Sequence, residues 1–462
     1  MNPTTVIAVF DIGKTNKKLF LFNEQYQIEF ERTVRFTETL DEDGDPCDSI
    51  DSLRGFVLNS LQELMQKEQY HIKAVNFTSY GASLVYIDGE GNPLTPLYNY
   101  LKPYPAVLKQ LFYNTYSGEA LFAQETASPV LGSLNSGMQL FRLKQQQPAV
   151  FERMQYALHL PQYLSYMLTG FACSDLTSIG CHTGLWDFHL QHYHQWTIKE
   201  SVQEKLAPVL MHEVTLPAIC GKPGRLEAGI GLHDSSAALI PYLVSFTEPF
   251  VLLSTGTWSI SLHPFNESPL TPEELRQDCL CYLTYDGKPV KASRLFAGQI
   301  HEDQVKRIGE YFSQPAGKYQ ALAPDPEIIR LLNTGSTKTN QNSPQPASPP
   351  AINFEQRDLS QFTNDVEAYH QLMIDIVEAQ IKSTQLIMNN VPVKDLYVDG
   401  GFSRNEIFMH LLSLYLPRLN VYAASVPQAT AIGAAMVIHS SWNSGPVPKN
   451  LISLQRYEAS IL

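Results

Sequence analysis

The chain has few cysteines, and they show no paired spacing. Six cysteines are scattered over 462 residues, and none belongs to a CxxC pair. Disulfide frameworks and CxxC-based metal or redox sites use regular, closely spaced cysteines. The scatter therefore indicates reduced thiols and a cytoplasmic protein.

Long hydrophobic runs are also missing. No stretch approaches 18 uninterrupted apolar residues, so we expect no membrane span. The first apolar run is short, ends at Asp11 and has no basic residue before it. We therefore expect no signal peptide at this end of the sequence.

Positive charge is in deficit. The chain carries 33 Lys and Arg against 46 Asp and Glu, which gives a formal net charge of −13. Such a chain repels polyanions, so we expect no nucleic-acid partner. ATP remains possible, because one local loop with a magnesium ion can hold phosphates in an acidic protein.

The length predicts two domains, since 462 residues are too many for one ordinary core. With 44% hydrophobic and 17% charged residues, the composition is globular. A strand, a polar glycine turn and a second strand open the chain at 6–22, and the same pattern recurs at 250–262. A duplicated fold with domains at 1–245 and 246–462 explains this recurrence, and coincidence is the alternative, because strand–turn–strand patterns are common.

Several further elements can be predicted from hydrophobic periodicity. Apolar spacing predicts a helix over 51–70, with Asp51 or Ser52 as its N-terminal cap. A helix at 362–390, a strand at 396–398 and a final helix at 427–439 follow in the second half. The polar, proline-rich segment 333–353 reads as a surface loop whose role stays open.

Two common nucleotide-binding motifs are absent. A P-loop ending at Gly13 would need glycine at position 8, which is Ala8, and a helix where a strand is predicted. No GxGxxG follows a strand either, so a Rossmann dinucleotide site is disfavoured.

Three polar glycine turns are present instead. Glycine turns expose backbone N–H groups that can bind phosphate oxygens, while an acid can hold hydrated magnesium. We assign Asp11 to magnesium and the other members, except Asp399, to the nucleotide, and the alternative is that these are ordinary turns. The turns contain Asp11, Gly13, Lys14, Thr15 and Asn16; Ser254, Thr255, Gly256 and Thr257; and Asp399, Gly400 and Gly401.

A histidine–aspartate pair lies just before the domain boundary. Asp234 could accept a proton from a substrate hydroxyl, and His233 could bind a sugar through a hydrogen bond. The alternative is that Asp234 only caps a helix.

In order and spacing, these segments resemble the FGGY family of carbohydrate kinases. The first turn resembles its first phosphate loop, residues 160–178 its N-terminal signature, 253–258 its second phosphate loop and 398–405 its adenosine segment. Residues 231–234 and 254–258 look most like the rhamnulokinase and fuculokinase branch. Three segments depart from the pattern: Ser83 and Gln162 stand where aspartates are usual, and 99–102 replaces an Asp-x-Arg segment.

The resemblance implies an α/β protein of two ribonuclease-H-like domains, as in actin and hexokinase, facing a central cleft. It implies ATP and Mg2+ as cofactors and a small ketose as substrate, with a 6-deoxy-ketohexose such as L-rhamnulose or L-fuculose expected. Asp234 would be the base, with Gly81, His233 and Ser235 at the sugar. Tyr80 and Ala82 could supply apolar atoms to it. Thr257, Gly401 and Asn405 would contact ATP.

Three other functions stay open on the sequence. The chain could phosphorylate xylulose, ribulose or glycerol, could be a non-catalytic sugar or nucleotide sensor, or could be an actin-like ATPase. The presence of Asp11, Asp234 and both phosphate turns disfavours a sensor, and Asp234 on the sugar side disfavours the ATPase. The sequence does not decide the oligomeric state, and a homodimer is one option.

Overall fold

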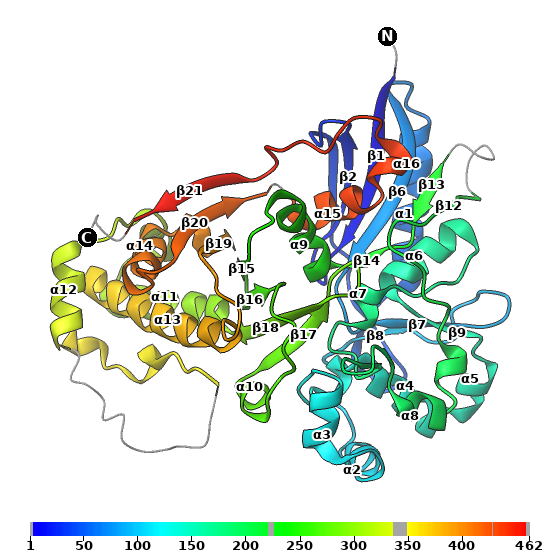
Figure 1. Cartoon of the computed structure of the whole chain (residues 1–462), viewed down its shortest axis with the longest axis horizontal. Helices are drawn as coiled ribbons and strands as arrows, with labels where there is room; N and C mark the ends of the chain where they lie inside the picture. Colours follow the sequence, from blue (N-terminus) through cyan, green and yellow to red (C-terminus); the bar gives the residue numbers. More distant parts are fainter. Residues whose placement is uncertain (1–2, 220–225, 336–348, 427, 459–462) are drawn as a thin grey trace. The chain divides into compact units, whose positions relative to one another are not determined.

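The structure is a computed structural model that describes residues 3–219, 226–335, 349–426 and 428–458 (Figure 1). It divides into two compact units. Unit 1 contains residues 1–245, 281–289 and 427–451, and unit 2 contains 246–280, 290–426 and 452–462. The predicted domains, 1–245 and 246–462, stay a prediction. The units differ from them by two later segments that pack in unit 1.

A mixed sheet forms the centre of unit 1. Its strand order is β12-β13-β6-β1-β2-β3, and β14 also pairs with β6. Strands β1, β2 and β3 form an antiparallel meander, and β6 lies parallel to β1. The sheet strands are β1 (Thr4–Ile12), β2 (Lys17–Asn23), β3 (Ile28–Val34), β6 (Tyr70–Ser79), β12 (Thr215–Pro217), β13 (Glu227–Gly229) and β14 (Leu232–His233).

Helices and small sheets complete unit 1. The shorter strands are β4 (Thr39–Leu40), β5 (Pro46–Asp48), β7 (Leu84–Ile87), β8 (Leu97–Tyr98), β9 (Tyr156–His159), β10 (Trp186–Asp187) and β11 (His192–Tyr193). The helices are α1 (Ile50–Met65), α2 (Ala106–Thr115), α3 (Gly118–Glu125), α4 (Ser136–Gln146), α5 (Pro148–Arg153), α6 (Leu160–Thr169), α7 (Leu176–Ile179), α8 (Gln195–Lys199), α9 (Asp234–Ser245), α15 (Ala429–Val437) and α16 (His439–Trp442).

Unit 2 is built around a second mixed sheet, of order β17-β18-β16-β15-β19-β20-β21. Its helices α11, α13 and α14 lie side by side (Figure 1). The elements are β15 (Phe250–Thr255), β16 (Ser259–His263), α10 (Pro272–Arg276), β17 (Cys279–Leu283), β18 (Pro289–Leu295), α11 (Ala297–Phe312), α12 (Pro326–Gly335), α13 (Asp365–Ile387), β19 (Asp395–Gly400), α14 (Glu406–Tyr415), β20 (Asn420–Ser425) and β21 (Ser453–Tyr457).

The two sheets share one strand pattern. In unit 1 the order β3-β2-β1-β6-β13 contains two antiparallel pairs and then two parallel pairs. In unit 2 the order β18-β16-β15-β19-β20 has the same sequence of pairings. The common order supports the duplicated fold, and the predicted α/β class is confirmed.

Most predicted elements are present, with one corrected detail. The helix predicted at 362–390 is α13, the strand at 396–398 is part of β19, and the final helix is α15. The predicted cap of α1 was wrong: the Ser49 side chain accepts the hydrogen bond from the amide of Ser52. The helix therefore begins before Asp51, because an N-cap residue must precede the first helical turn.

The core of unit 1 explains why the final helix returns to it. Phe10 on β1 packs against Phe56 of α1 and Phe77 of β6. In α15, a Cβ on Gly433 would lie 1.9 Å from the carbonyl oxygen of Ala237 in α9. The small residues of α15 thus permit two helices far apart in sequence to approach closely.

Two further expectations from the sequence concern the 333–353 segment and a membrane span. Most of the 333–353 segment lies outside the described residues, so its surface-loop assignment stays a prediction. None of the described helices is long and apolar enough to cross a membrane.

Candidate active site

Asp234 is the first residue of α9 and directly follows His233 at the end of β14. Its Oδ1 accepts a hydrogen bond from the amide of Ser235 at 2.6 Å. The Nε2 of His233 lies 3.2 Å from the same oxygen. A carboxylate at a helix N-terminus is stabilised by the helix dipole, and here the neighbouring residues also fix its orientation.

Burial changes the acid–base properties of this pair. Burial raises the pKa of Asp234 to about 6, although the hydrogen bonds from Ser235 oppose the rise. Burial also lowers the pKa of His233 to about 3. His233 is therefore neutral near pH 7, so its Nε2, 3.2 Å from the Asp234 carboxylate, does not form an ion pair with it. The Asp234 side chain still keeps 32% of its exposure, so part of the carboxylate remains reachable.

A second carboxylate, Asp11, lies near the end of β1 in the same unit. Thr430 of α15 donates a 2.9 Å hydrogen bond to its Oδ2. Burial raises the pKa of Asp11 to about 6, the Thr430 hydrogen bond opposes the rise, and the negative charge of Asp234 adds to it. Two carboxyl groups with raised pKa that sense one another are typical of functional sites.

Gly81 leaves the space that His233 needs. A Cβ at Gly81 would lie 2.5 Å from the Cys181 Sγ and 3.1 Å from the His233 ring. The Cys181 Sγ itself lies 3.0 Å from His233 Nε2. A side chain at position 81 would therefore displace the residue that orients Asp234.

The first glycine turn has an internal backbone hydrogen bond, and its lysine already pairs with two carboxylates. The amide of Gly13 donates to the carbonyl of Asn16. The ammonium of Lys14 lies 2.8 Å from Asp48 and 3.2 Å from Glu38. Its assignment to phosphate stays a prediction, and it requires Lys14 to leave two carboxylates.

The other residues of this turn have different environments. Thr15 is exposed. The side-chain oxygen of Asn16 accepts a 2.8 Å hydrogen bond from Arg35 on the loop after β3. Neither the exposure of Thr15 nor the hydrogen bond of Asn16 tests the predicted role of these two residues in nucleotide binding.

Of the predicted sugar-side residues, Tyr80, Ala82 and His233 are buried in unit 1, and Gly81 and Ser235 are half-buried. The Tyr80 hydroxyl donates a 2.7 Å hydrogen bond to Asp48. Ala82 is buried and has a positive φ of 58°. Gln162 donates to the carbonyls of Ile230 and Gly231, which explains how an amide is accommodated in place of the usual aspartate.

In unit 2, the other two glycine turns follow adjacent parallel strands. Ser254 pairs with Asp399, and Thr255 with Gly400. The amide of Gly401 donates to the Thr255 carbonyl at 2.9 Å, and the amide of Phe402 donates to the Thr255 hydroxyl at 3.0 Å. The carboxyl ends of adjacent parallel strands thus bring both turns to one edge of the sheet.

Gly400→Ala should destabilise unit 2. Gly400 has a φ of +89°, and a Cβ there would lie 1.9 Å from the Thr255 carbonyl oxygen. The left-handed conformation alone costs a residue with a Cβ about 1–2 kcal/mol. We expect a lower Tm and a raised KM for ATP, measured by thermal unfolding and initial rates.

Gly401→Ala is the matched control for stability. Its φ is −61°, and its nearest neighbour beyond the adjoining residues would be 4.0 Å from a new Cβ. This variant should unfold at the wild-type temperature. An equal loss of Tm in the two variants would contradict the steric explanation.

A cavity of about 840 Å³ lies beside these turns within unit 2. Tyr319 stacks on Tyr369 with ring centroids 4.9 Å apart, and Asn405 donates a 2.8 Å hydrogen bond to the Tyr369 hydroxyl. The lining residues that the sequence predicted are Thr255, Gly256, Thr257, Gly401 and Asn405, and those that it missed include Gly298, His301, Glu302, Tyr319, Gln320, Tyr369 and Arg404.

The missed residues have a common reason. Apart from Tyr369 and Arg404, they lie between Gly298 and Gln320, a stretch that contains none of the three glycine turns. Gly298, His301 and Glu302 lie on α11, and no motif spacing marks them. Tyr319 and Gln320 lie on the short 3-10 helix Ala316–Ala321, which carries no motif either. Arg404 is different, because it follows the third glycine turn and could have been found there.

Two family models match the chain. Residues 6–210 match the N-terminal domain of the FGGY family of carbohydrate kinases, and residues 247–446 match the FGGY carbohydrate kinase C-terminal domain. The chain belongs to the FGGY family. The resemblance seen in the sequence is therefore confirmed over most of the chain.

Curated FGGY relatives are distant. A rhamnulokinase from Halalkalibacterium halodurans is 22% identical over 272 residues, covering 54% of this chain and 54% of the relative. An L-fuculokinase from Escherichia coli K12 is 24% identical over 267 residues, covering 55% and 56%. The chain spans about half of the length of the curated relatives it matches.

Solved structures extend the similarity to nearly the whole chain. A carbohydrate kinase from Novosphingobium aromaticivorans has a TM-score of 0.78 at 23% identity and covers 99% of this chain and 94% of its own. A ligand-bound xylulose kinase from Lactobacillus acidophilus has a TM-score of 0.78 at 13% identity, covering 98% and 93%. At such identities the likeness shows the fold alone, and it confirms the predicted two-domain FGGY-kinase fold.

Proposed function

We propose that this FGGY protein is an ATP-dependent carbohydrate kinase that transfers the γ-phosphoryl group to a hydroxyl of a small ketose. The observation that carries the proposal is Asp234. It is a partly exposed carboxylate with a pKa of about 6, oriented by His233 and Ser235. A general base works best when its pKa lies near the working pH.

The reaction needs one proton acceptor. As the sugar hydroxyl attacks the γ-phosphorus, its proton passes to Asp234, a new P–O bond forms, and the bond to the departing ADP oxygen breaks. The pKa of His233 is lowered to about 3, so His233 does not compete with Asp234 for the proton. Neutral His233 is therefore suited to orient Asp234 while the charge of the carboxylate is kept. Positioning and charge stabilisation supply most of the rate enhancement in such transfers.

The chain offers a fitting place for each implied cofactor. Among the described residues, the hydrogen bond from Thr430 engages only Oδ2 of Asp11, so Oδ1 can serve as an oxygen ligand for Mg2+. Magnesium, when bound, supplies charge neutralisation on the phosphates. The cavity of unit 2, with its stacked tyrosines and the backbone of two glycine turns, fits a nucleotide.

For the acceptor, we propose a 6-deoxy-ketohexose, L-rhamnulose or L-fuculose, phosphorylated at O1. The support is the His233–Asp234 pair, together with relatives named rhamnulokinase and L-fuculokinase. Buried Ala82 and Tyr80 offer apolar atoms that could face a methyl group. Such a contact is worth only about 1–3 kcal/mol, so discrimination against other ketoses should be modest.

The test is the kcat/KM of ADP release with L-rhamnulose, L-fuculose, D-xylulose, L-ribulose and glycerol. We expect one of the deoxy-ketoses to give the highest value. A pentulose or glycerol exceeding both by about tenfold would overturn the acceptor assignment and leave the kinase. Nucleotide binding without turnover of any sugar would favour a sensor instead.

A further inference from the structure

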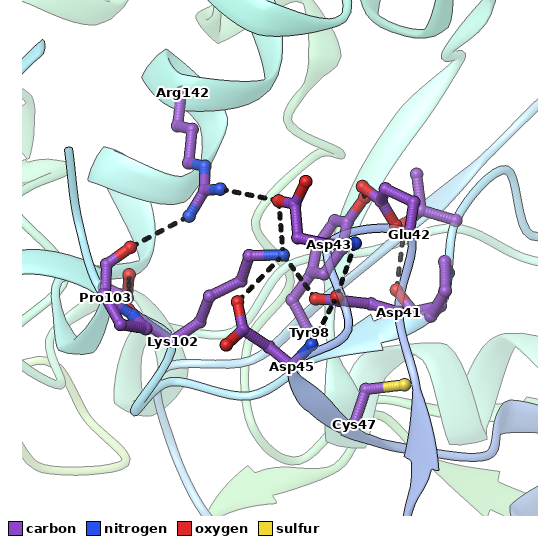
Figure 2. Close-up of polar contacts among 12 residues, drawn as sticks. Asp41, Glu42, Asp43, Asp45, Cys47, Tyr98, Lys102, Pro103 and Arg142 are labelled. Atoms are coloured by element: carbon purple, nitrogen blue, oxygen red, sulfur yellow. Dashed lines mark hydrogen bonds and ion pairs between the residues drawn. The ribbon is translucent and has the colours of Figure 1, made fainter.

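A compact charge cluster lies in unit 1, near residues already assigned to the sugar side. Asp41, Asp43 and Asp45 direct their carboxylates toward one ammonium group, that of Lys102 (Figure 2). One carboxylate oxygen from each of the three lies within 4.8 Å of the others. We call these four residues the lysine cage.

The ammonium of Lys102 forms ion pairs with all three carboxylates of the cage. Lys102 Nζ lies 2.8 Å from Asp43 and 3.4 Å from Asp45, and it also donates to Asp41. A lysine ammonium has three donors and no acceptor, so three carboxylates match it. The Lys102 side chain is only 5% exposed and that of Asp41 is fully buried, whereas the side chains of Asp43 and Asp45 are 54% and 35% exposed.

The backbone around the ammonium resembles a cation-binding loop. The Oδ1 of Asp41 accepts hydrogen bonds from the amides of Asp43 and Asp45, both at 3.0 Å, and Gly44 has a φ of +83°. Alternating acids in a tight glycine loop are the arrangement that binds calcium in other proteins. Here the ammonium of Lys102 takes the place of such a cation.

The cage fixes the segment 99–102, which replaces the usual Asp-x-Arg of the family. The amide of Lys102 donates to the carbonyl of Asn99, and Ser133 donates a 2.6 Å hydrogen bond to the carbonyl of Lys102. In the three-stranded sheet β4-β5-β8, strand β5 pairs with β8, which directly precedes this segment. The segment is therefore held at both ends, by the pairing of β8 before it and by the contacts of Lys102 at its end.

That course brings Tyr100 to the sugar side. Its ring lies 5.9 Å from the Tyr80 ring, at 63°, and Tyr80 is fixed by its hydrogen bond to Asp48 at the end of β5. Burial raises the pKa of Tyr100, and the negative charge of Asp234 adds to the rise. Tyr100 therefore lies within electrostatic range of the proposed base.

We propose that Lys102 is a positioning residue for acceptor recognition: held in a cation's place by the cage, it fixes segment 99–102 so that Tyr100 and Tyr80 form one wall of the acceptor site. Lys102 itself does not touch the sugar. The inference rests on the proposed function, since it concerns the acceptor of that same reaction.

Lys102→Met keeps most of the length of the unbranched side chain and removes the ammonium. A small misplacement of a substrate-positioning group can cost up to about 100-fold, so we expect the KM of the best acceptor to rise about 10- to 100-fold. The KM of ATP should stay within about twofold. Lys109→Met is the matched control, because Lys109 pairs with Glu119 at 3.0 Å on the exposed surface of unit 1.

A second measurement separates positioning from general damage. In Lys102→Met the three carboxylates can bind an oxygen-seeking cation. Terbium luminescence, sensitised by Tyr98 beside the cage, should show a site that wild type lacks, and adding Asp45→Asn should remove it. Calcium at fixed magnesium should lower the acceptor KM of Lys102→Met toward wild type and leave that of Lys109→Met unchanged.

Several results would overturn the inference. A folded Lys102→Met enzyme with an acceptor KM within about twofold of wild type would exclude the positioning role. So would calcium that fills the cage without lowering the KM. If Lys102→Met does not fold, Asp45→Asn alone removes the longest contact and should raise the acceptor KM severalfold, and an unchanged KM would again contradict us.

Failure of the proposed function would look different. If wild type phosphorylates no sugar at all, the kinase proposal fails. The terbium titration would still decide whether Lys102 occupies a cation's place, because its readout does not depend on turnover.

Discussion

Asp234→Asn should lower kcat by about 10²- to 10⁴-fold, because a positioned general base contributes that much to proton transfer. Asparagine has nearly the same shape and keeps an acceptor for the Ser235 amide, so α9 should still begin at this residue. Steady-state kinetics with the best ketose, together with circular dichroism and ATP binding, measure the effect. ATP affinity should remain near wild type.

The pH profile gives an independent readout of the same group. The base must be ionised, and the pKa of Asp234 is raised to about 6. At saturating magnesium, wild-type kcat/KM should therefore be level well above this pH and fall as the pH drops through it. In Asp234→Asn this acid limb should disappear from the residual activity.

Asp51→Asn is a suitable control, since Asp51 is an exposed carboxylate in the first turn of another helix of unit 1. It should keep wild-type kcat and pH dependence. If Asp234→Asn retained more than about a tenth of wild-type turnover, Asp234 would not be the base.

Asp11→Ala should remove most of the magnesium-dependent activity. A metal ion stabilises several kcal/mol of transition-state charge, which corresponds to a loss of about 10²- to 10³-fold. Asp11 lies near the end of β1. Thr430 donates its hydrogen bond to Oδ2, so Oδ1 can act as the metal ligand. Initial rates over a magnesium series would show a low maximum and a shift to higher magnesium concentration.

Thr430→Val provides the graded comparison. It removes only the hydrogen bond to Oδ2 and should leave a smaller change in magnesium dependence. Unchanged activity and magnesium dependence in Asp11→Ala would show that the first glycine turn has another role.

Local patterns predicted much of the fold because they depend on neighbouring residues. The apolar run of β1, the meander that follows and the long helix α13 are each visible in periodicity alone. The N-cap Ser49 was missed because it stands only two residues before Asp51, and Asp51 and Ser52 are equally plausible caps by residue type. The composition of β4 and β5 gave no signal, since such short strands form only when a partner strand pairs with them.

The environment of charged residues was not predictable in the same way. Lys14 reads as a phosphate-binding cation in its glycine turn, yet Asp48 and Glu38 already bind its ammonium. Although burial would raise the pKa of Asp48, its hydrogen bonds from Lys14 and Tyr80 keep that pKa below the usual value. Glu38 and Asp48 lie 24 and 34 positions after Lys14 in the chain, and no sequence motif has such a spacing.

The sequence alone determined the two-domain α/β class, the FGGY family and the glycine turns, because turn chemistry and strand periodicity are properties of contiguous residues. Only the tertiary structure decided that Asp11 senses Asp234, that α15 returns to unit 1 to hold Asp11, and that Lys102 fills a cage of three carboxylates. Electrostatic and packing interactions depend on distance in space, and no local pattern encodes which distant residues meet.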